Sequence, residues 1–558
     1  MPSYRTPGVY VEEISTLPPS VAEVSTAIPA FFGYTEQGQG VHRLSTLLEF
    51  EELFGGPQKS DYVVSTTSSG ADSSRVINTI SRTSPDVPES NLYYALSHFF
   101  KNGGGSCYVV SVGAFGTAPE AAHFSDGLAL LEKEDEPTLI VLTDAVNLDS
   151  SGYYSVASEA LAQCAKLGDR FTILDVKDGD VDAFRGAAGI GANNLKYGAA
   201  YHPYVQTSIT RHYDEASVSI NSGEANQPVT STLAFGEAAV MVSYIGAEGA
   251  SSQAKFTLGE AGAEVTISVD ANSRQLTIGN VRDLTGNDVV AAWTAWAAEN
   301  NAAGFDVSIA GDGSGALDTL GSTFNSLIAP EGGGASSTTL ASIKSGEQPE
   351  TALYNSVRTA LAAERVTLPP SAAIAGIYAQ VDRTRGVWKA PANVGVSAII
   401  GPVTKITHEE QERLNVDSTG GKSINAIRAF TGKGTLVWGA RTLAGNDNEW
   451  RYVPVRRLFI TIEESCQKAT SFAVFEPNDS TTWLKVKGMI ESYLYGLWEQ
   501  GALAGSSADS AYFVNVGLGK TMTPQDVLEG RMNVEIGIAA VRPAEFIVLR
   551  FSHKLQEA

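Results

Sequence analysis

Two glycine-rich stretches contain the residue types that bind phosphate groups. DSTGGKS (417–423) ends in the Gly-Lys-Ser of a P-loop, but that motif also needs a glycine five residues before its Gly-Lys pair, where this chain has Val416. GIGANN (189–194) begins like a dinucleotide-binding fingerprint, but Asn194 occupies the position of the third glycine. We therefore interpret both stretches as loops and predict no cofactor for this chain.

Glu463 and Glu464 are paired carboxylates of the kind used in acid–base chemistry. They follow Arg456 and Arg457 in VRRLFITIEES, which we expect to be a strand. Adjacent side chains of a strand point to opposite faces, so the two carboxylates need not converge, and an Arg–Glu ion-pair network is favoured. The seven histidines are dispersed and the three cysteines form no CxxC pair, which predicts buried reduced thiols and no metal site. We expect no catalytic residues and predict that the chain is not an enzyme.

The chain has 558 residues and a formal net charge of −23, which is unevenly distributed. Residues 351–558 contain 22 Lys and Arg against 20 Asp and Glu, which leaves 17 basic and 42 acidic residues for positions 1–350. Nucleic-acid-binding proteins present a basic stripe, so no nucleic-acid partner is predicted. No window contains the ~18 uninterrupted apolar residues of a membrane span, and the N-terminus lacks the layout of a signal peptide. We expect no direct membrane insertion, and folding in the cytoplasm.

Strand and helix patterns alternate in the first part of the chain, and these elements would position any site there. PAFFGYTE, SCYVVSVG, TLIVLTD and RFTILDV are apolar runs typical of buried strands, and helical stretches separate most of them. This order predicts an α/β layer with a largely parallel sheet. Residues 59–90 are rich in Ser, Thr, Asp and Gly and predict a long exposed loop. Residues 483–501, WLKVKGMIESYLYGLWEQG, predict an amphipathic helix.

A change of composition after YHPYV (201–205) indicates an inserted domain. Residues 206–350 are rich in Gly, Ser and Ala and hold 5 basic against 17 acidic residues. KFTLG, EVTISVD and RQLTIG predict a small β-meander, DVVAAWTAWAAEN a helix and FDVSIAG a further strand. We expect a β-rich, mostly solvent-facing domain, which makes the whole chain a mixed α/β and α+β multi-domain protein.

Both ends of the chain carry Pro-flanked strand patterns without a local partner. Near the N-terminus, Val9, Tyr10 and Val11 lie in RTPGVYVEEI; near the C-terminus, Phe546, Ile547, Val548 and Leu549 lie in RPAEFIVLRFSHKL. Bare strand edges invite aggregation, whereas a strand added to the sheet of another copy gives specific association. If copies join head to tail and the rotation does not close, a helical polymer results. We therefore hypothesise that both ends are donated to neighbouring copies.

Many motifs in order resemble those of the tail-sheath family of contractile phage tails, R-type bacteriocins and contractile injection systems. The resemblance spans both ends of the chain and all but residues 59–90 and 206–350. It rests on RTPGVYVEE, PAFFGYTE, LFGG, FFKNGGGSCYVVSV, DRFTILDV, YHPYV, LPPSAAIAGIYAQVDRTRGVWKAPAN, TLVWGARTL, YVPVRRLFITIEES, FAVFEPND, GLWEQGAL and RPAEFIVLR.

The resemblance implies a structural subunit with no enzymatic residues to carry over. It implies a helical homo-oligomer around an inner tube protein, with baseplate and tail-terminator partners, assembled in the bacterial cytoplasm into a phage tail or tail-like particle. The terminal arms would link neighbouring subunits while the sheath contracts and drives the tube through a target envelope. The expected segments are an N-terminal donated arm (1–22), an α/β sheath domain (23–205), an inserted surface domain (206–350), a C-terminal sheath domain (351–540) and a C-terminal donated strand (541–558).

Two other classes of protein remain as alternatives. Another self-assembling shell or surface-layer protein would also use strand donation, and tubes of two diameters would distinguish a sheath from it. A nucleotide-binding α/β enzyme would suit the layering, but the incomplete glycine motifs argue against it.

Overall fold

The computed structural model describes residues 21–550 apart from residues 70–73, 84, 86, 223–228, 236–239, 247–251, 261, 271–272, 301, 316, 318–322, 328–336 and 346–349. The described residues form two compact units. The first contains residues 21–59, 84–212 and 364–550, and the second contains residues 60–83 and 213–363.

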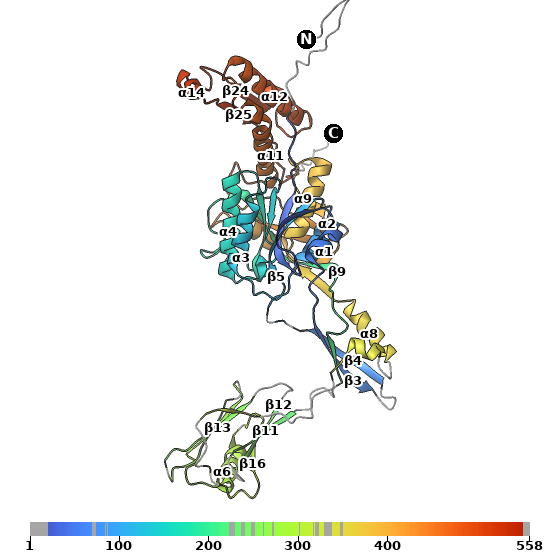
Figure 1. Ribbon diagram of the computed structural model, residues 1–558, viewed down its shortest axis with the longest axis vertical. Coiled ribbons are helices and arrows are strands. Elements are labelled where there is room, and N and C mark those ends of the chain that lie inside the picture. Colours follow the sequence, from blue (N-terminus) through green and yellow to red (C-terminus); the bar gives the residue numbers. More distant parts are fainter. Residues whose placement is uncertain are drawn as a thin grey trace, which may run out of the picture. The chain divides into compact units, whose positions relative to one another are not determined.

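A nine-stranded sheet forms the centre of the first unit (Figure 1). Its strands, in spatial order, are β2 (Gly40–Leu44), β5 (Cys107–Ala114), β1 (Pro29–Thr35), β6 (Leu139–Val141), β7 (Phe171–Asp175), β8 (Gly198–His202), β22 (Ile424–Phe430), β23 (Gly434–Trp438) and β20 (Val394–Gly395). The strands from β5 to β22 are parallel, while β2 and β23 are antiparallel to their inner neighbours and β20 is antiparallel to β23. The predicted α/β layer with a largely parallel sheet is confirmed.

Helices cover both faces of this sheet because successive strand residues point to opposite sides. Phe31 packs into the core on one face and Phe32 into the core on the other, and both are fully buried. The first core lies under α1 (Leu47–Phe54), α2 (Leu92–Lys101) and α9 (Ser371–Arg385), and the second under α3 (Ala121–Leu131), α4 (Ser150–Leu167) and α5 (Val181–Arg185). A smaller sheet of β19 (Arg365–Leu368), β9 (Val205–Thr210) and β21 (Ile399–Pro402) and helix α10 (His408–Asn415) complete this part.

The C-terminal part of the first unit is mainly helical. It contains α11 (Val453–Ala469), α12 (Ser480–Glu499), α13 (Ala508–Ala511), α14 (Pro524–Leu528) and a hairpin of β24 (Tyr512–Val516) and β25 (Val534–Ile538). Helix α12 confirms the predicted amphipathic helix: Val486, Met489, Ile490 and Leu497 are buried as its spacing requires, and the Asp479 carboxylate caps its first turn.

The strand predicted for VRRLFITIEES is wrong, because these residues belong to α11. Pro454 sits in the first turn, where its missing N–H costs nothing. The helix contributes Val453 and Ile460 to the core beneath the sheet, and a separate face to the core of the C-terminal part. Its β-branched and aromatic residues favour strands, and they concealed the helical spacing of its buried side chains.

The second unit contains two hydrophobic cores. One lies between α7 (Leu340–Ser345), α8 (Thr351–Leu361) and a sheet of β18 (Ser337–Thr339), β10 (Val218–Ser222), β3 (Tyr62–Ser69) and β4 (Ser74–Arg82). The other combines α6 (Gly286–Glu299) with a sheet of β11 (Val229–Phe235), β12 (Val240–Gly246) and β16 (Phe305–Ile309) and a sheet of β14 (Thr266–Asp270), β15 (Gln275–Gly279), β13 (Gln253–Thr257) and β17 (Asn325–Ser326).

Two expectations for this unit are corrected. The exposed loop predicted for residues 59–90 is wrong over residues 62–82, where β3 and β4 form a hairpin and β3 pairs in parallel with β10. The β-meander is wrong in its connections, because β13 pairs in parallel with β15, whereas β14 pairs antiparallel with β15. Strand β9 belongs to the first unit, and the later segment of the second unit begins at residue 213.

Candidate functional site

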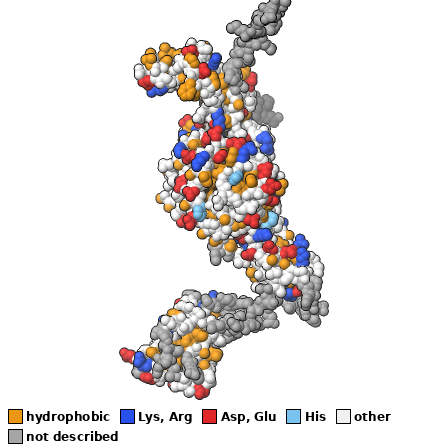
Figure 2. All heavy atoms as spheres, in the orientation of Figure 1, with side chains coloured by type: hydrophobic (Ala, Val, Ile, Leu, Met, Phe, Trp, Pro, Cys, Tyr) orange, Lys and Arg blue, Asp and Glu red, His pale blue; other side chains and the backbone are white. Residues whose placement is uncertain are grey.

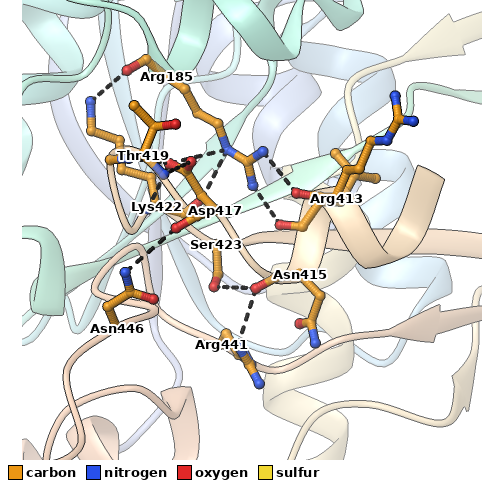
Figure 3. Close-up of polar contacts among 11 residues, drawn as sticks. Arg185, Arg413, Asn415, Asp417, Thr419, Lys422, Ser423, Arg441 and Asn446 are labelled. Carbon is orange, nitrogen blue, oxygen red and sulfur yellow. Dashed lines mark hydrogen bonds and ion pairs between the residues drawn. The ribbon is translucent and has the colours of Figure 1, made fainter. Parts of the chain in front are cut away.

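The backbone N–H groups and the lysine of the loop DSTGGKS form hydrogen bonds within the protein instead of facing a ligand (Figure 3). The Asp417 carboxylate accepts hydrogen bonds from the backbone N–H groups of Thr419, Gly420 and Lys422 at 3.0, 3.1 and 3.1 Å. Lys422 is 6% exposed and its Nζ donates to the Arg185 carbonyl at 2.9 Å. Burial opposes ionisation, but these N–H groups and Arg185 hold the pKa of Asp417 below its ordinary value. The donors that a phosphate would need are therefore used internally, which agrees with the loop interpretation.

The other motifs with chemical potential also lie in structural settings. GIGANN follows helix α5 and precedes a short 3₁₀ turn, so it lacks the strand-to-helix context of a dinucleotide site. On α11, Arg456 pairs with Glu463 at 2.8 Å, and Glu464 with Lys468 at 2.8 Å. The predicted Arg–Glu pairing is confirmed for Arg456 and Glu463, on a helix, whereas Arg457 pairs with Asp382 and Glu464 with Lys468. The three cysteines are buried thiols, and within the described residues no group of three or more His, Cys, Asp or Glu side chains is arranged to hold a metal.

Four consecutive large apolar residues are exposed near the end of the described chain. Phe546, Ile547, Val548 and Leu549 are 73%, 80%, 76% and 72% exposed. The structure assigns no helix or strand to residues 541–550, so this stretch does not pair with the subunit's own sheets. The corresponding N-terminal residues, Val9, Tyr10 and Val11, lie outside the described residues.

The residue just before this apolar stretch is fixed to the body of the unit. The Arg441 guanidinium donates from Nε and Nη2 to the two carboxylate oxygens of Glu545 at 2.8 and 2.5 Å. Arg441 is buried, and its Nη1 donates to the Asn415 carbonyl at 3.1 Å, next to the loop of Figure 3. The Tyr452 hydroxyl adds a third hydrogen bond to Glu545 at 3.3 Å. A bidentate pair of this kind fixes direction as well as position, so the apolar stretch starts from a defined point.

The β24–β25 hairpin offers unpaired strand edges. Within the described residues, these two strands pair only with each other, from Tyr512 opposite Ile538 to Val516 opposite Val534. Hydrophobic side chains are visible on the surface over α12, β24 and α14 in Figure 2. An open edge beside apolar surface is the setting in which another strand can be added.

No helix in the described part of the chain is long and apolar enough to cross a membrane.

Comparison with known proteins gives three consistent matches. Residues 445–554 match the family model of the phage tail sheath C-terminal domain. The tail sheath protein of Vibrio phage KVP40 is 27% identical over 187 residues, which are 33% of this chain and 26% of that protein. The tail sheath protein of Enterobacteria phage T4 is 26% identical over 129 residues, 23% of this chain and 19% of that protein. These curated relatives are therefore matched over about a quarter of their length or less.

Solved structures match over the whole chain. The helical sheath of the anti-feeding prophage in its contracted state is 25% identical, with a TM-score of 0.54 over 99% of this chain and 100% of that chain. The contracted sheath complex of PVC, an extracellular contractile injection system, is 25% identical, with a TM-score of 0.53 over 100% and 99%. Together with the mixed fold described above, these matches show that residues 445–554 belong to the phage tail sheath C-terminal domain family and that the chain as a whole is similar to the sheath proteins of contractile tails and contractile injection systems.

Proposed function

We propose that this chain is the structural subunit of a contractile sheath, which polymerises helically around an inner tube protein and shortens to drive the tube through a target envelope. The main observation behind the proposal is that the exposed apolar stretch Phe546–Leu549 follows Glu545, which the ion pair with Arg441 fixes to the body of the unit. The likeness to contracted sheath subunits over the whole chain supports it.

The exposed stretch supplies enough free energy to link subunits. In an added strand, alternate side chains face the core of the acceptor, so two of the four residues would be buried. Burying two large apolar side chains contributes roughly 3–6 kcal/mol, from about 1.5–3 kcal/mol each. Backbone hydrogen bonds to the acceptor edge set the register. Part of this gain offsets the entropy of ordering the segment, so each link is of moderate strength and the lattice derives its stability from repetition.

The acceptor that the structure offers is the β24–β25 hairpin of a neighbouring copy. Within the described residues no further strand pairs with either outer edge, so one hairpin could accept both an N-terminal segment containing Val9, Tyr10 and Val11 and a C-terminal segment containing Phe546–Leu549. A sheet assembled from several copies would remain intact while the bodies of the subunits rotate as rigid units.

Contraction in this proposal needs no nucleotide. The polar groups of the loop that most resembles a P-loop are bonded to Asp417 and Arg185. We propose instead that the free energy is stored in the extended lattice, as in other metastable assemblies. The inner tube, baseplate and tail-terminator proteins are the proposed partners, and assembly is proposed to occur in the bacterial cytoplasm.

Electron microscopy of the purified chain, alone and co-expressed with a tube protein, tests this function. A chain ending at Glu545 should remain folded but form no tubes, because it lacks the apolar stretch. A chain ending at Arg550 is the matched control, since it keeps Phe546–Leu549, and it should form striated tubes. Tubes of two diameters, with and without a baseplate, would distinguish a sheath from a surface-layer protein. Normal tubes from the shorter chain would refute the proposed role of this segment.

A further inference from the structure

The first described residues of the chain are held by a buried ion pair. Arg457 on α11 donates from Nη1 and Nη2 to the two carboxylate oxygens of Asp382 at 3.0 and 2.5 Å, and its Nη2 also donates to the Thr26 carbonyl at 2.7 Å. The guanidinium lies over the Tyr378 ring, 4.6 Å from its centre. The side chains of Arg457 and Asp382 are 4% and 6% exposed. A planar guanidinium with this many partners has one orientation, so it fixes the Thr26 carbonyl in space.

Two further hydrogen bonds fix the same stretch. The backbone N–H of Val24 donates to the Ser465 hydroxyl on α11 at 3.2 Å. The Thr138 hydroxyl donates to the Thr26 carbonyl at 3.0 Å and accepts from the Ile28 N–H at 2.9 Å. Residues 24–28 therefore run along α11 in a defined direction before the chain enters β1.

The opposite end of the chain is held at the start of the same helix. Tyr452, the N-cap residue of α11, hydrogen bonds to Glu545 and forms a β-bridge with Arg441, which is itself paired with Glu545. From Tyr452 to Ser465 the helix rises ~20 Å, at about 1.5 Å per residue. Helix α11 therefore fixes the residues from which both terminal segments start, here called the roots of the segments: residues 24–28 and Glu545.

We infer that α11 fixes the starting points of both terminal segments. Two buried ion pairs would then set the directions in which the segments leave the subunit for neighbouring copies, and their positioning residues are Arg457, Asp382, Arg441 and Glu545. The inference rests on the proposed function. Its physical basis is that a strand can reach a specific acceptor edge only if it starts from a defined point with a defined direction. A freely hinged segment of the same sequence would still stick to other copies, but it would do so with variable geometry. The two ion pairs therefore determine the order of the polymer more than its stability.

The test compares Glu545→Gln with Glu409→Gln. Glu545 lies on a terminal segment, and its amide variant keeps its shape and its acceptor oxygen but removes the counter-charge of the buried Arg441, so a melting temperature equal to that of the parent is required before its tubes are compared. Glu409 also pairs with an arginine, Arg413, but both side chains are about three-quarters exposed, and neither forms a hydrogen bond or ion pair with the described residues of a terminal segment. At the N-terminal end, Ser465→Ala removes the acceptor of the Val24 N–H, and the control Ser111→Ala removes a buried hydroxyl that hydrogen bonds to Thr35 within the sheet.

Each variant is purified, its melting temperature is measured, and tubes are formed with the tube protein and imaged. Tubes of Glu545→Gln and Ser465→Ala should show fewer helical layer lines than tubes of the parent, which means that helical order is lost. Alternatively, the amount of protein in ordered tubes should fall at least tenfold. Both controls should match the parent chain. If Ser465→Ala lowers the melting temperature, Glu545→Gln decides the result. Tubes from Glu545→Gln with the helical parameters and yield of the parent would overturn the inference. If the parent chain itself forms no tubes with its tube protein, the proposed function fails, which is a separate outcome.

Discussion

Replacing Arg457 by Met should destabilise the first unit strongly. The variant keeps an apolar stem of similar length but leaves the Asp382 carboxylate buried without its counter-charge, and it removes one donor from the Thr26 carbonyl. Removing one partner of a buried pair costs about 3–5 kcal/mol. Because about 1.4 kcal/mol changes an equilibrium constant tenfold, amides that exchange only through unfolding of this unit should exchange faster by roughly two to four orders of magnitude.

Hydrogen–deuterium exchange with mass spectrometry measures this effect in each unit separately. Peptides from β7 and β8 report on the first unit, and peptides from β3 and β4 in the same sample serve as the internal control and should be unchanged. Arg413→Met is the matched variant, because its exposed pair with Glu409 contributes less than about 1 kcal/mol.

The double variant Arg457→Met/Asp382→Leu completes this experiment. Replacing both members of a buried pair by apolar residues of similar volume is often close to neutral, so it should recover most of the protection. A change of less than tenfold in Arg457→Met, or no recovery in the double variant, would show that the buried pair does not carry this stability.

Three further outcomes are expected. A chain lacking residues 1–15 should melt like the parent by circular dichroism but form no tubes, and normal tubes would contradict the N-terminal link. Replacing residues 229–327 by a short linker should leave tube formation intact, because the remaining strands of the second unit still form the β3–β4–β10 sheet; an insoluble product would contradict this. Burial raises the pKa of Asp175 to about 7 and that of Asp144 to about 6, from 3.8, so the folded chain keeps protons that the unfolded chain releases. The free energy of unfolding should therefore fall as the pH rises from about 4 to about 7, and Asp175→Asn should flatten this fall in urea titrations, whereas an unchanged profile would show that Asp175 does not titrate in this range.

The parallel sheet could be predicted because its strands are short apolar runs with clear boundaries. PAFFGYT, LIV and FTILD become β1, β6 and β7, each buried on both faces. The loop at residues 417–423 was also predictable, because one missing glycine and the absence of a preceding strand are visible in the sequence. Local sequence patterns are enough to predict an element when all of its residues have similar surroundings, as in a strand that is buried on both faces.

The elements that sequence reasoning missed depend on distant partners. Helix α11 reads as a strand because Leu, Phe, Ile and Thr alternate in it, and its arginines look exposed until Asp382 and Glu463 are seen to pair with them. The β3–β4 hairpin is rich in Ser and Thr and gains its place from β10, which lies about 150 residues further along the chain. The roots of the terminal segments could not be predicted, since Thr26 and Arg457 are 431 residues apart.

Helix α11 also limits where this chain can be engineered. It supplies side chains to two hydrophobic cores at once, that of the sheet and that of the C-terminal part. Inserting a single residue would rotate everything after it by about 100° and shift it by about 1.5 Å, so one of the two cores would lose its partners. Peptide tags or fused domains therefore belong in the loops of the second unit, while the length of α11 should be left unchanged in any redesigned particle.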